Sequence, residues 1–406
     1  MFEVNKPTIY FKSSEKMEEV ADKSIQLIVT SPPYGKIKDY GKDEQIGFFD
    51  SFEQYFRRLN AVWKECYRIL EPQCRLVINV GDQYLRAADH ERYRIISISS
   101  KIVEDCVDVG FDFLGDIIWQ KVSTTNTTGG CSLMGSIYYP RNGLLTYDYE
   151  HVLIFKKYEG KGKQVDLKRK ELSKISLSEW KKWFIGHWRF PGIMQKEHLA
   201  MFPEELPYRI IRMFSHIGDT ILDPFVGSGT TLKVAKALFR KSIGYELNQE
   251  YEKIIQAKIS DSKPGYFQDY QYLLYRLYEK SLLGNFSLDY SKQKQKGILV
   301  IRNLKDEEII LDYLLLDKFN TDPVNFTREL KNKMKENTVL NYLKSKKNWE
   351  SFLNYVIVVN SEPDEHFEYV KKNLEKIDQL EKDKRVTLID FNDIVSDQYN
   401  ILDLFP

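Results

Sequence analysis

Hydrophobic and polar residues follow two alternating patterns through the first two-thirds of the chain. Short apolar runs predict strands at residues 8–11, 25–30, 75–80, 113–120, 151–156, 220–222 and 241–245. Between these runs, apolar residues recur at helical spacing and predict helices at 52–70, 94–109, 207–215 and 230–239. Alternation of strands with helices is typical of an α/β fold whose mainly parallel sheet is covered on both faces.

The pattern changes after residues 259–265, which read ISDSKPG and indicate the end of a first domain. Beyond them, the sequence predicts strands at 297–302, 354–360 and 385–390, and helices at 306–319, 327–343 and 365–384. We therefore expect a first domain over residues 1–262 and a smaller C-terminal α/β domain over residues 266–406. The length of 406 residues agrees with two domains, because single hydrophobic cores rarely grow that large.

Composition narrows the class of protein. The net charge is +1, so no overall basic field advertises a nucleic-acid partner, although a local patch can still bind one. The four cysteines lie far apart with no Cys-x-x-Cys pair, which argues against a metal site or a disulfide framework. No stretch is long and apolar enough to span a membrane, and the N-terminus lacks a signal-peptide core. We expect a soluble cytoplasmic protein with no membrane partner.

Residues 30–34 read TSPPY and directly follow the apolar run at 25–29. Proline has no N–H to give a sheet or a helical turn, so Pro32 and Pro33 end the strand in a rigid, extended stub. The carbonyl groups of this stub project without a partner from their own segment. The segment from Ser31 to Tyr34 therefore indicates an acceptor site, and a simple strand-ending turn is the alternative interpretation.

A second candidate site lies at residues 220–231, which read TILDPFVGSGTT. Gly227 and Gly229 allow a tight turn and a close approach to a ligand, and the next helix begins at Thr230 and Thr231 with free backbone N–H groups. A further strand at 241–245 ends at Glu246, where an acid can bridge the two hydroxyls of a ribose. The Gly-Lys-Ser/Thr ending of a phosphate-binding P-loop is absent. The ligand is therefore a nucleoside without a phosphate chain, or a dinucleotide.

TSPPY and DPFVGSGTT, in that order, resemble the amino-group DNA methyltransferases that use S-adenosylmethionine. The layout is similar to the circularly permuted branch, in which the catalytic motif precedes the cofactor motif, and the similarity spans about residues 8–258. Further segments that match the family pattern are LEPQCRLVINVGD at 70–82, DIIWQK at 116–121, YEHVLIFK at 149–156 and HLAMFPEEL at 198–206. The resemblance implies a Rossmann-like methyltransferase fold, double-stranded DNA as substrate and a bacterial or archaeal source. It also implies a cognate restriction endonuclease that acts on the same site.

The resemblance assigns roles to both motifs. Ser31 Oγ and the Pro32 carbonyl would accept the two hydrogens of an exocyclic amine, and the prolines would keep that geometry stiff. Tyr34 would stack on a base that has been flipped out of the duplex. The residues expected to hold the cofactor are Asp223, Pro224, Phe225, Gly227, Gly229, Thr230, Thr231 and Glu246. The family often has Gly-Asp-Ser where this chain has Lys12-Ser13-Ser14, so Ser13 would replace an acid with a weaker hydroxyl contact.

Ser31 bears on which base is methylated. The family resemblance implies that serine at this position favours cytosine N4, whereas an acid or asparagine favours adenine N6. A neutral hydroxyl can also serve the ring N3 of cytosine, so we expect a cytosine-N4 enzyme, with adenine N6 as the alternative. An oxidoreductase that binds a dinucleotide, a non-catalytic binding protein and an RNA methyltransferase are further alternatives.

Contacts to DNA are expected from a short basic segment at 157–192 and from two loops, at residues 35–47 and 123–143. The tryptophans of this segment, Trp180, Trp183 and Trp188, are either base contacts or core residues. The side chains expected to bind DNA are Lys36, Lys38, Arg141, Lys168, Lys170, Arg169 and Arg189. The C-terminal domain has no catalytic signature, and we expect it to add DNA recognition. A fused nuclease or a partner-binding module are the alternatives.

Overall fold

The computed structural model describes residues 7–35, 41–85, 92–121, 134–135, 140–166, 169–170, 173–175, 177–192 and 202–260, and five strands beyond them. The chain divides into two compact units, Met1–Tyr266 and Phe267–Pro406. The sequence predicts a boundary between residues 262 and 266.

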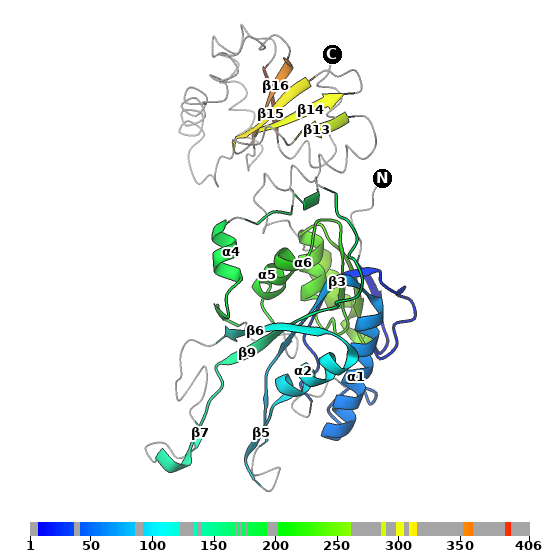
Figure 1. Ribbon diagram of the computed structural model, residues 1–406, viewed down its shortest axis with the longest axis vertical. Helices are drawn as coiled ribbons and strands as arrows, with labels where there is room; N and C mark the ends of the chain where they lie inside the picture. Colours follow the sequence, from blue (N-terminus) through cyan, green and yellow to red (C-terminus); the bar gives the residue numbers. More distant parts are fainter. Residues whose placement is uncertain are drawn as a thin grey trace. The chain divides into compact units, whose positions relative to one another are not determined.

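The first unit is built on an eight-stranded sheet with the strand order β1-β12-β11-β2-β3-β9-β6-β10 (Figure 1). Neighbouring strands run parallel except that β9 is antiparallel to both β3 and β6. The fold is therefore α/β with a mainly parallel sheet, as the sequence predicts. The strand bounds are β1 Thr8–Tyr10, β2 Ile25–Thr30, β3 Leu70–Val80, β6 Asp112–Gln120, β9 Tyr149–Lys156, β10 His187–Arg189, β11 Thr220–Asp223 and β12 Lys241–Tyr245.

Helices cover both faces of this sheet (Figure 1). On one face lie α1 (Phe52–Ile69) and α2 (Ile98–Val109), which pack on each other and on β3, β6 and β9. On the other face lie α5 (Glu205–Phe214) and α6 (Thr230–Ala237), and α7 (Glu252–Ser260) packs on α6. The remaining short elements are α4 Leu177–Trp183, η2 Pro140–Asn142, η3 Gln249–Tyr251, and the two-stranded pairs β4 Gln83–Leu85 with β5 Arg94–Ile96 and β7 Met134–Gly135 with β8 Gly143–Leu144.

Helix α1 shows how the sequence specifies the main core. Ser51 caps it, because the Ser51 hydroxyl accepts from the Gln54 N–H while the Gln54 side chain accepts from the Ser51 N–H. Its fully buried side chains recur at helical spacing, at Tyr55, Leu59, Val62, Trp63, Cys66 and Ile69. This stripe packs against inward-facing residues of β2, β3 and β9.

Two predicted elements are wrong in part. The helix predicted at 94–109 begins only at Ile98, because residues 94–96 pair with β4 as strand β5. In the second unit, residues 308–314 form strand β15 (Glu308–Leu314) and not the helix predicted at 306–319. Pairing with β14 on one side and β16 on the other provides the backbone hydrogen bonds that override the local helical spacing.

The second unit contains a five-stranded sheet with the order β13-β14-β15-β16-β17. The first three strands pair antiparallel and the last three pair parallel. Its strands are β13 Phe286–Asp289, β14 Ile298–Asn303, β15, β16 Phe352–Val359 and β17 Val386–Asp390, so the strands predicted near 297–302, 354–360 and 385–390 are present. The helices predicted at 327–343 and 365–384 lie outside the described residues.

Lys157 is buried although it stands at the start of the basic segment 157–192. Only 1% of its surface is exposed, and its ammonium donates to the Tyr67 carbonyl at 2.6 Å and to the Leu70 carbonyl at 3.0 Å. These carbonyls belong to the end of α1, where the helix has no backbone donors left to satisfy them. An ion pair with Glu159 at 3.1 Å offsets the charge. Lys157 is therefore a structural cap and does not contact DNA.

Replacing Lys157 tests this cap. Lys157→Met keeps the apolar stem but leaves two buried carbonyls without a donor, so we expect the free energy of unfolding to fall by about 1–3 kcal/mol. Urea unfolding measures the change. The control is Lys161→Met on the exposed part of the same segment, for which the change should stay within about 0.5 kcal/mol. Equal stability of the two variants would contradict a capping role.

Candidate functional site

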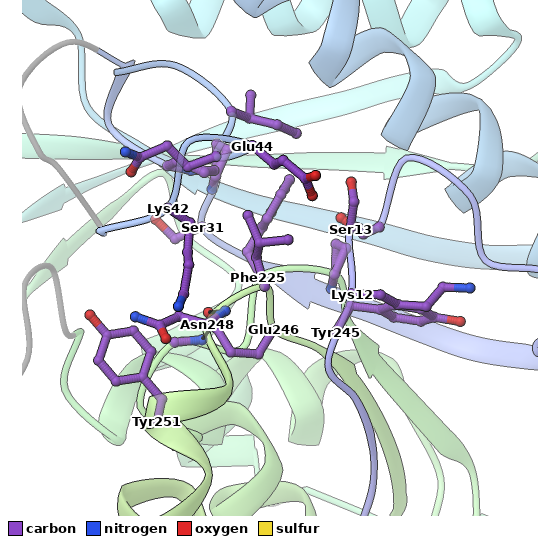
Figure 2. A pocket seen from close by; sticks show the side chains of 18 of the residues that line it. Lys12, Ser13, Ser31, Lys42, Glu44, Phe225, Tyr245, Glu246, Asn248 and Tyr251 are labelled. Carbon is purple, nitrogen blue, oxygen red and sulfur yellow. Dashed lines mark hydrogen bonds between the residues drawn. The ribbon is translucent and has the colours of Figure 1, made fainter. Parts of the chain in front are cut away.

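The main pocket of the first unit opens at the carboxyl ends of three neighbouring parallel strands, β2, β11 and β12. Ligands of open α/β sheets bind at this edge, because the loops that leave the strands gather there. Figure 2 shows Phe225 in the middle of the pocket, with Ser31 and Lys42 on one side and Ser13 on the other. The pocket is lined by residues 12–14, 31–34, 42, 44–46, 224, 225, 227, 245–248 and 251.

Both motifs singled out from the sequence contribute to this one pocket. The whole acceptor segment lines the pocket, and so do part of the glycine turn, Ser13 and Glu246. The predicted residues that line it are Ser13, Ser31, Pro32, Pro33, Tyr34, Pro224, Phe225, Gly227 and Glu246. The chain separation between the motifs is nearly 200 residues, yet β2 and β11 are adjacent and in register at Leu27–Ile221 and Ile28–Leu222. The sheet therefore brings the acceptor segment and the glycine turn together.

Four predicted cofactor residues lie behind the pocket and do not line it, namely Asp223, Gly229, Thr230 and Thr231. Asp223 is 1% exposed, and its Oδ1 accepts from the Thr30 hydroxyl at 2.7 Å and from the Phe225 N–H at 3.0 Å. Burial raises the pKa of Asp223 to about 6. Because Thr30 precedes Ser31, Asp223 joins the end of β2 to the start of the glycine turn.

Glu246 stands at the tip of β12 and does face the pocket. Its two carboxylate oxygens accept from the Gly227 N–H and the Asn248 N–H, both at 2.8 Å. Gly227 has φ +54°, a conformation that glycine adopts without strain, and this brings its backbone close to the carboxylate. Burial raises the pKa of Glu246 to about 7 despite these hydrogen bonds. Glu246 is thus a desolvated acid aimed at any ligand in the pocket.

The diproline stub is held from the side of helix α1. The Pro33 carbonyl accepts from the Tyr55 hydroxyl at 2.8 Å and from the Gly35 N–H at 2.9 Å. Tyr55 lies on the buried face of α1, so the position of its hydroxyl is fixed by the surrounding core. With the Pro33 carbonyl occupied by two donors, the Pro32 carbonyl and the Ser31 hydroxyl are the acceptors suited to a ligand.

Residues 42–46 form one rim of the pocket, a role that the sequence did not indicate. Arg58 of α1 donates to the Glu44 carbonyl at 2.8 Å and to the Gln45 carbonyl at 3.0 Å, and pairs with Glu15 at 2.7 Å. Lys42 pairs with Glu250 at 3.7 Å. In the loop 35–47, which we expected to face DNA, residues 42 and 44–46 line the pocket. Residues 42–46 read KDEQI, and such a charged stretch does not by itself indicate a pocket in the sequence.

The residues predicted to bind DNA differ in position. Lys170, Arg141 and Arg189 are exposed. Arg141 lies on η2, and Arg189 lies at the end of β10. Arg169 is half-buried, and its guanidinium donates to Asp219 at 2.6 Å and to the Ile217 carbonyl at 2.7 Å, so it supports the turn that leads into β11. Lys36, Lys38 and Lys168 lie outside the described residues.

The tryptophans of the basic segment also differ. Trp183 and Trp188 are buried, so these two are core residues. Trp180 is 53% exposed and stacks on Phe184 with ring centroids 4.0 Å apart. Across the described part of the chain, no helix has the length and apolar character needed to cross a membrane.

Known proteins resemble the first unit. The DNA methylase family N6_N4_Mtase matches residues 25–257. Type II methyltransferase M.MjaI of Methanocaldococcus jannaschii is 36% identical over 284 residues, covering 62% of this chain and 90% of that protein. Type II methyltransferase M.MthZI of Methanothermobacter thermautotrophicus is 33% identical over 279 residues, covering 63% of this chain and 76% of that protein.

A solved structure shares the fold. TTHA0409 of Thermus thermophilus, in its complex with S-adenosyl-L-methionine, is 29% identical with a TM-score of 0.53, covering 64% of this chain and 96% of that one. The family match spans more than half of the chain and includes the acceptor segment, the glycine turn and Glu246. This chain therefore belongs to the N6_N4_Mtase family of DNA methylases.

Proposed function

We propose that this DNA methyltransferase moves a methyl group from S-adenosylmethionine to the exocyclic N4 amine of a cytosine flipped out of double-stranded DNA. The observation that carries the proposal is the shared pocket, in which the Ser31–Tyr34 stub follows β2, Gly227 follows β11 and Glu246 follows β12, three strands that are adjacent in the sheet. Adenine N6 is the alternative acceptor, and the circularly permuted order of the motifs is part of the proposal.

The residues of the pocket fit this cofactor. S-adenosylmethionine is a nucleoside that carries an electrophilic methyl group on a positively charged sulfur, and it has no phosphate. Glu246 offers a desolvated carboxylate to the ribose hydroxyls, and Gly227 allows close approach. Phe225 provides an apolar wall, and Ser13 provides a hydroxyl where the family often has an acid. TTHA0409, solved with this cofactor, supports the assignment.

The stub would act by orienting the acceptor amine. The lone pair of an exocyclic amine is delocalised into the base ring, so the nitrogen is a poor nucleophile. Ser31 Oγ and the Pro32 carbonyl would accept its two hydrogens, polarise the nitrogen and hold its lone pair toward the cofactor side of the pocket. Because the Tyr55 and Thr30 hydrogen bonds fix both ends of the stub, little reorganisation is needed as positive charge develops.

The preference for cytosine rests on Ser31. A serine hydroxyl is both donor and acceptor, so it can serve the amine and the neighbouring ring N3 of cytosine. Adenine N6 would be favoured by an acid or an asparagine at this position. The relatives M.MjaI and M.MthZI are named type II methyltransferases, which supports a protecting role beside a restriction endonuclease of the same site.

We further propose that the exposed cations Arg141, Lys170 and Arg189 bind the DNA backbone. The second unit, Phe267–Pro406, would add recognition of the target sequence. The support is the short length of segment 157–192, which leaves little room for a reader within the first unit.

The product identifies the target base. Plasmid DNA is incubated with the full-length protein and tritiated S-adenosylmethionine, then digested to nucleosides and separated. We expect the label in N4-methylcytosine. Label in N6-methyladenine would show the alternative acceptor, and label that enters only RNA in a competition would overturn the assignment to DNA.

The roles of Ser31 and Glu246 separate in paired variants. Ser31→Ala removes one acceptor for the amine, so the methyl-transfer rate should fall about 100-fold or more while cofactor affinity stays nearly unchanged. Glu246→Gln should do the reverse, weakening cofactor binding more than the rate at saturating cofactor. Calorimetry and single-turnover kinetics provide the two readouts. A large loss of cofactor affinity in Ser31→Ala would contradict the role given to Ser31.

Cofactor affinity should depend on pH through Glu246. Its pKa of about 7 in the free protein means that half of the carboxyl groups carry a proton near neutrality, and the ribose hydroxyls prefer the ionised form. Affinity should therefore rise from about pH 6 to about pH 8, by up to about tenfold per unit below the pKa. Glu246→Gln cannot titrate and serves as the control for titration of the cofactor itself. Identical pH profiles for both proteins would remove Glu246 from the site.

A further inference from the structure

A buried polar cluster lies directly behind Tyr34, and neither motif includes it. At its centre is Glu150, which is 5% exposed. Glu150 Oε1 accepts from the Tyr34 hydroxyl at 3.1 Å and from the Lys121 ammonium. Glu150 Oε2 accepts from the Asn79 side-chain amide at 2.7 Å, and Asn79 is also buried.

The antiparallel strand β9 explains why these residues meet. Its first residues lie at the carboxyl ends of β3 and β6, since Val80 pairs with His151 and Trp119 pairs with Glu150. Asn79 comes from the end of β3, and Lys121 directly follows β6. Three strands therefore deliver one polar side chain each to the edge of the sheet where the pocket opens.

Stability alone is a poor reason for this cluster. A buried carboxylate loses its hydration, and apolar residues of similar volume often stabilise a core as well or better. Glu150 is also closely packed, because a Cβ atom at Gly81 would lie 3.3 Å from its Cγ. A fixed, charged acceptor is instead suited to hold a donor in one place, and the Tyr34 hydroxyl is the donor that lines the pocket.

We propose that Glu150 is a positioning residue for methyl transfer, which acts through Tyr34. The inference rests on the proposed function. Two side-chain torsions set the orientation of a tyrosine ring. A hydrogen bond from the phenol hydroxyl fixes the position of the ring tip at the pocket wall, and because the O–H prefers to lie in the ring plane, the direction of the acceptor also favours one ring plane. The flipped base would then meet a ring face that is already in place, with no further ordering of the ring on stacking. Asn79 and Lys121 hold the carboxylate in turn.

The test compares four full-length proteins: wild type, Glu150→Gln, Tyr34→Phe and the double variant. Glu150→Gln is expected to fold, because the buried Asn79 Oδ1 has no partner among the described residues and can accept from the new amide. In that arrangement the oxygen of the new amide still faces the Tyr34 hydroxyl but carries no charge, so Glu150→Gln weakens the contact. Tyr34→Phe removes only the hydroxyl and so removes the same contact completely. Single-turnover transfer from tritiated S-adenosylmethionine to plasmid DNA gives the rate, and calorimetry gives cofactor affinity.

Tyr34→Phe should lower the transfer rate by about 10- to 100-fold and Glu150→Gln, which keeps a neutral acceptor, by a smaller factor, with cofactor affinity within about twofold of wild type in both. The double variant should be no more than about twofold slower than the slower single variant, since Glu150→Gln acts only through the contact that Tyr34→Phe removes. Glu71→Gln is the matched control, because Glu71 is 4% exposed and accepts from Gln26 at the opposite end of β3. Its rate should stay near wild type.

Three results would overturn the inference while wild type remains active. The first is a Tyr34→Phe protein that transfers methyl groups at the wild-type rate. The second is a double variant whose rate loss equals the product of the two single losses. The third is a rate loss in Glu150→Gln that is no larger than the loss in Glu71→Gln. A wild-type protein that labels no DNA would instead refute the proposed function, and the inference with it.

Discussion

The hydrogen bond from the Thr30 hydroxyl to the Asp223 carboxylate joins the two halves of the site. It spans 2.7 Å and links the ends of two adjacent parallel strands, β2 and β11. Ser31 follows the donor directly, and the glycine turn follows the acceptor. Because both groups are buried, the bond is not screened by water, and it sets the distance between the acceptor stub and the glycine turn. The other contacts of the site depend on the relative position of β2 and β11 that this hydrogen bond fixes.

Burying the acids of this site lowers the stability of the folded protein. Asp223 and Glu246 have pKa values raised to about 6 and about 7, both chiefly by burial. An acid whose pKa is raised on folding favours the folded state below its unfolded pKa, and this contribution is lost as the pH rises through the folded pKa. The free protein therefore loses stability across mildly acidic to neutral pH through these two groups. A ligand that donates hydroxyl groups to Glu246 offsets part of that cost, which is the usual relation between a desolvated site and its substrate.

The sequence predicts what local chemistry determines. Two prolines after an apolar run and two glycines before a helix leave few backbone conformations, so both motifs and the strands that carry them follow from short stretches. The structure adds what only distant neighbours determine. Asp223 has the sequence context of a pocket residue, yet its carboxylate turns inward to Thr30, 193 positions away. Lys157 has the context of a solvated charge, yet it caps α1. Residues 308–314 have the apolar spacing of a helix, yet they form a strand because strands pair with them on both sides.

The acceptor stub and the rim of the pocket are held by different kinds of contact. The stub has little backbone hydrogen bonding of its own, and buried side chains from two elements hold it, Tyr55 at Pro33 and Glu150 at Tyr34. The rim at 42–46 depends on Arg58, whose side chain and that of its partner Glu15 are 22% and 27% exposed. Partly exposed ion pairs are screened by salt and contribute little, whereas buried hydrogen bonds to fixed groups persist. The more rigid contacts thus hold the stub that is proposed to orient the amine, and the weaker contacts hold the rim of the pocket.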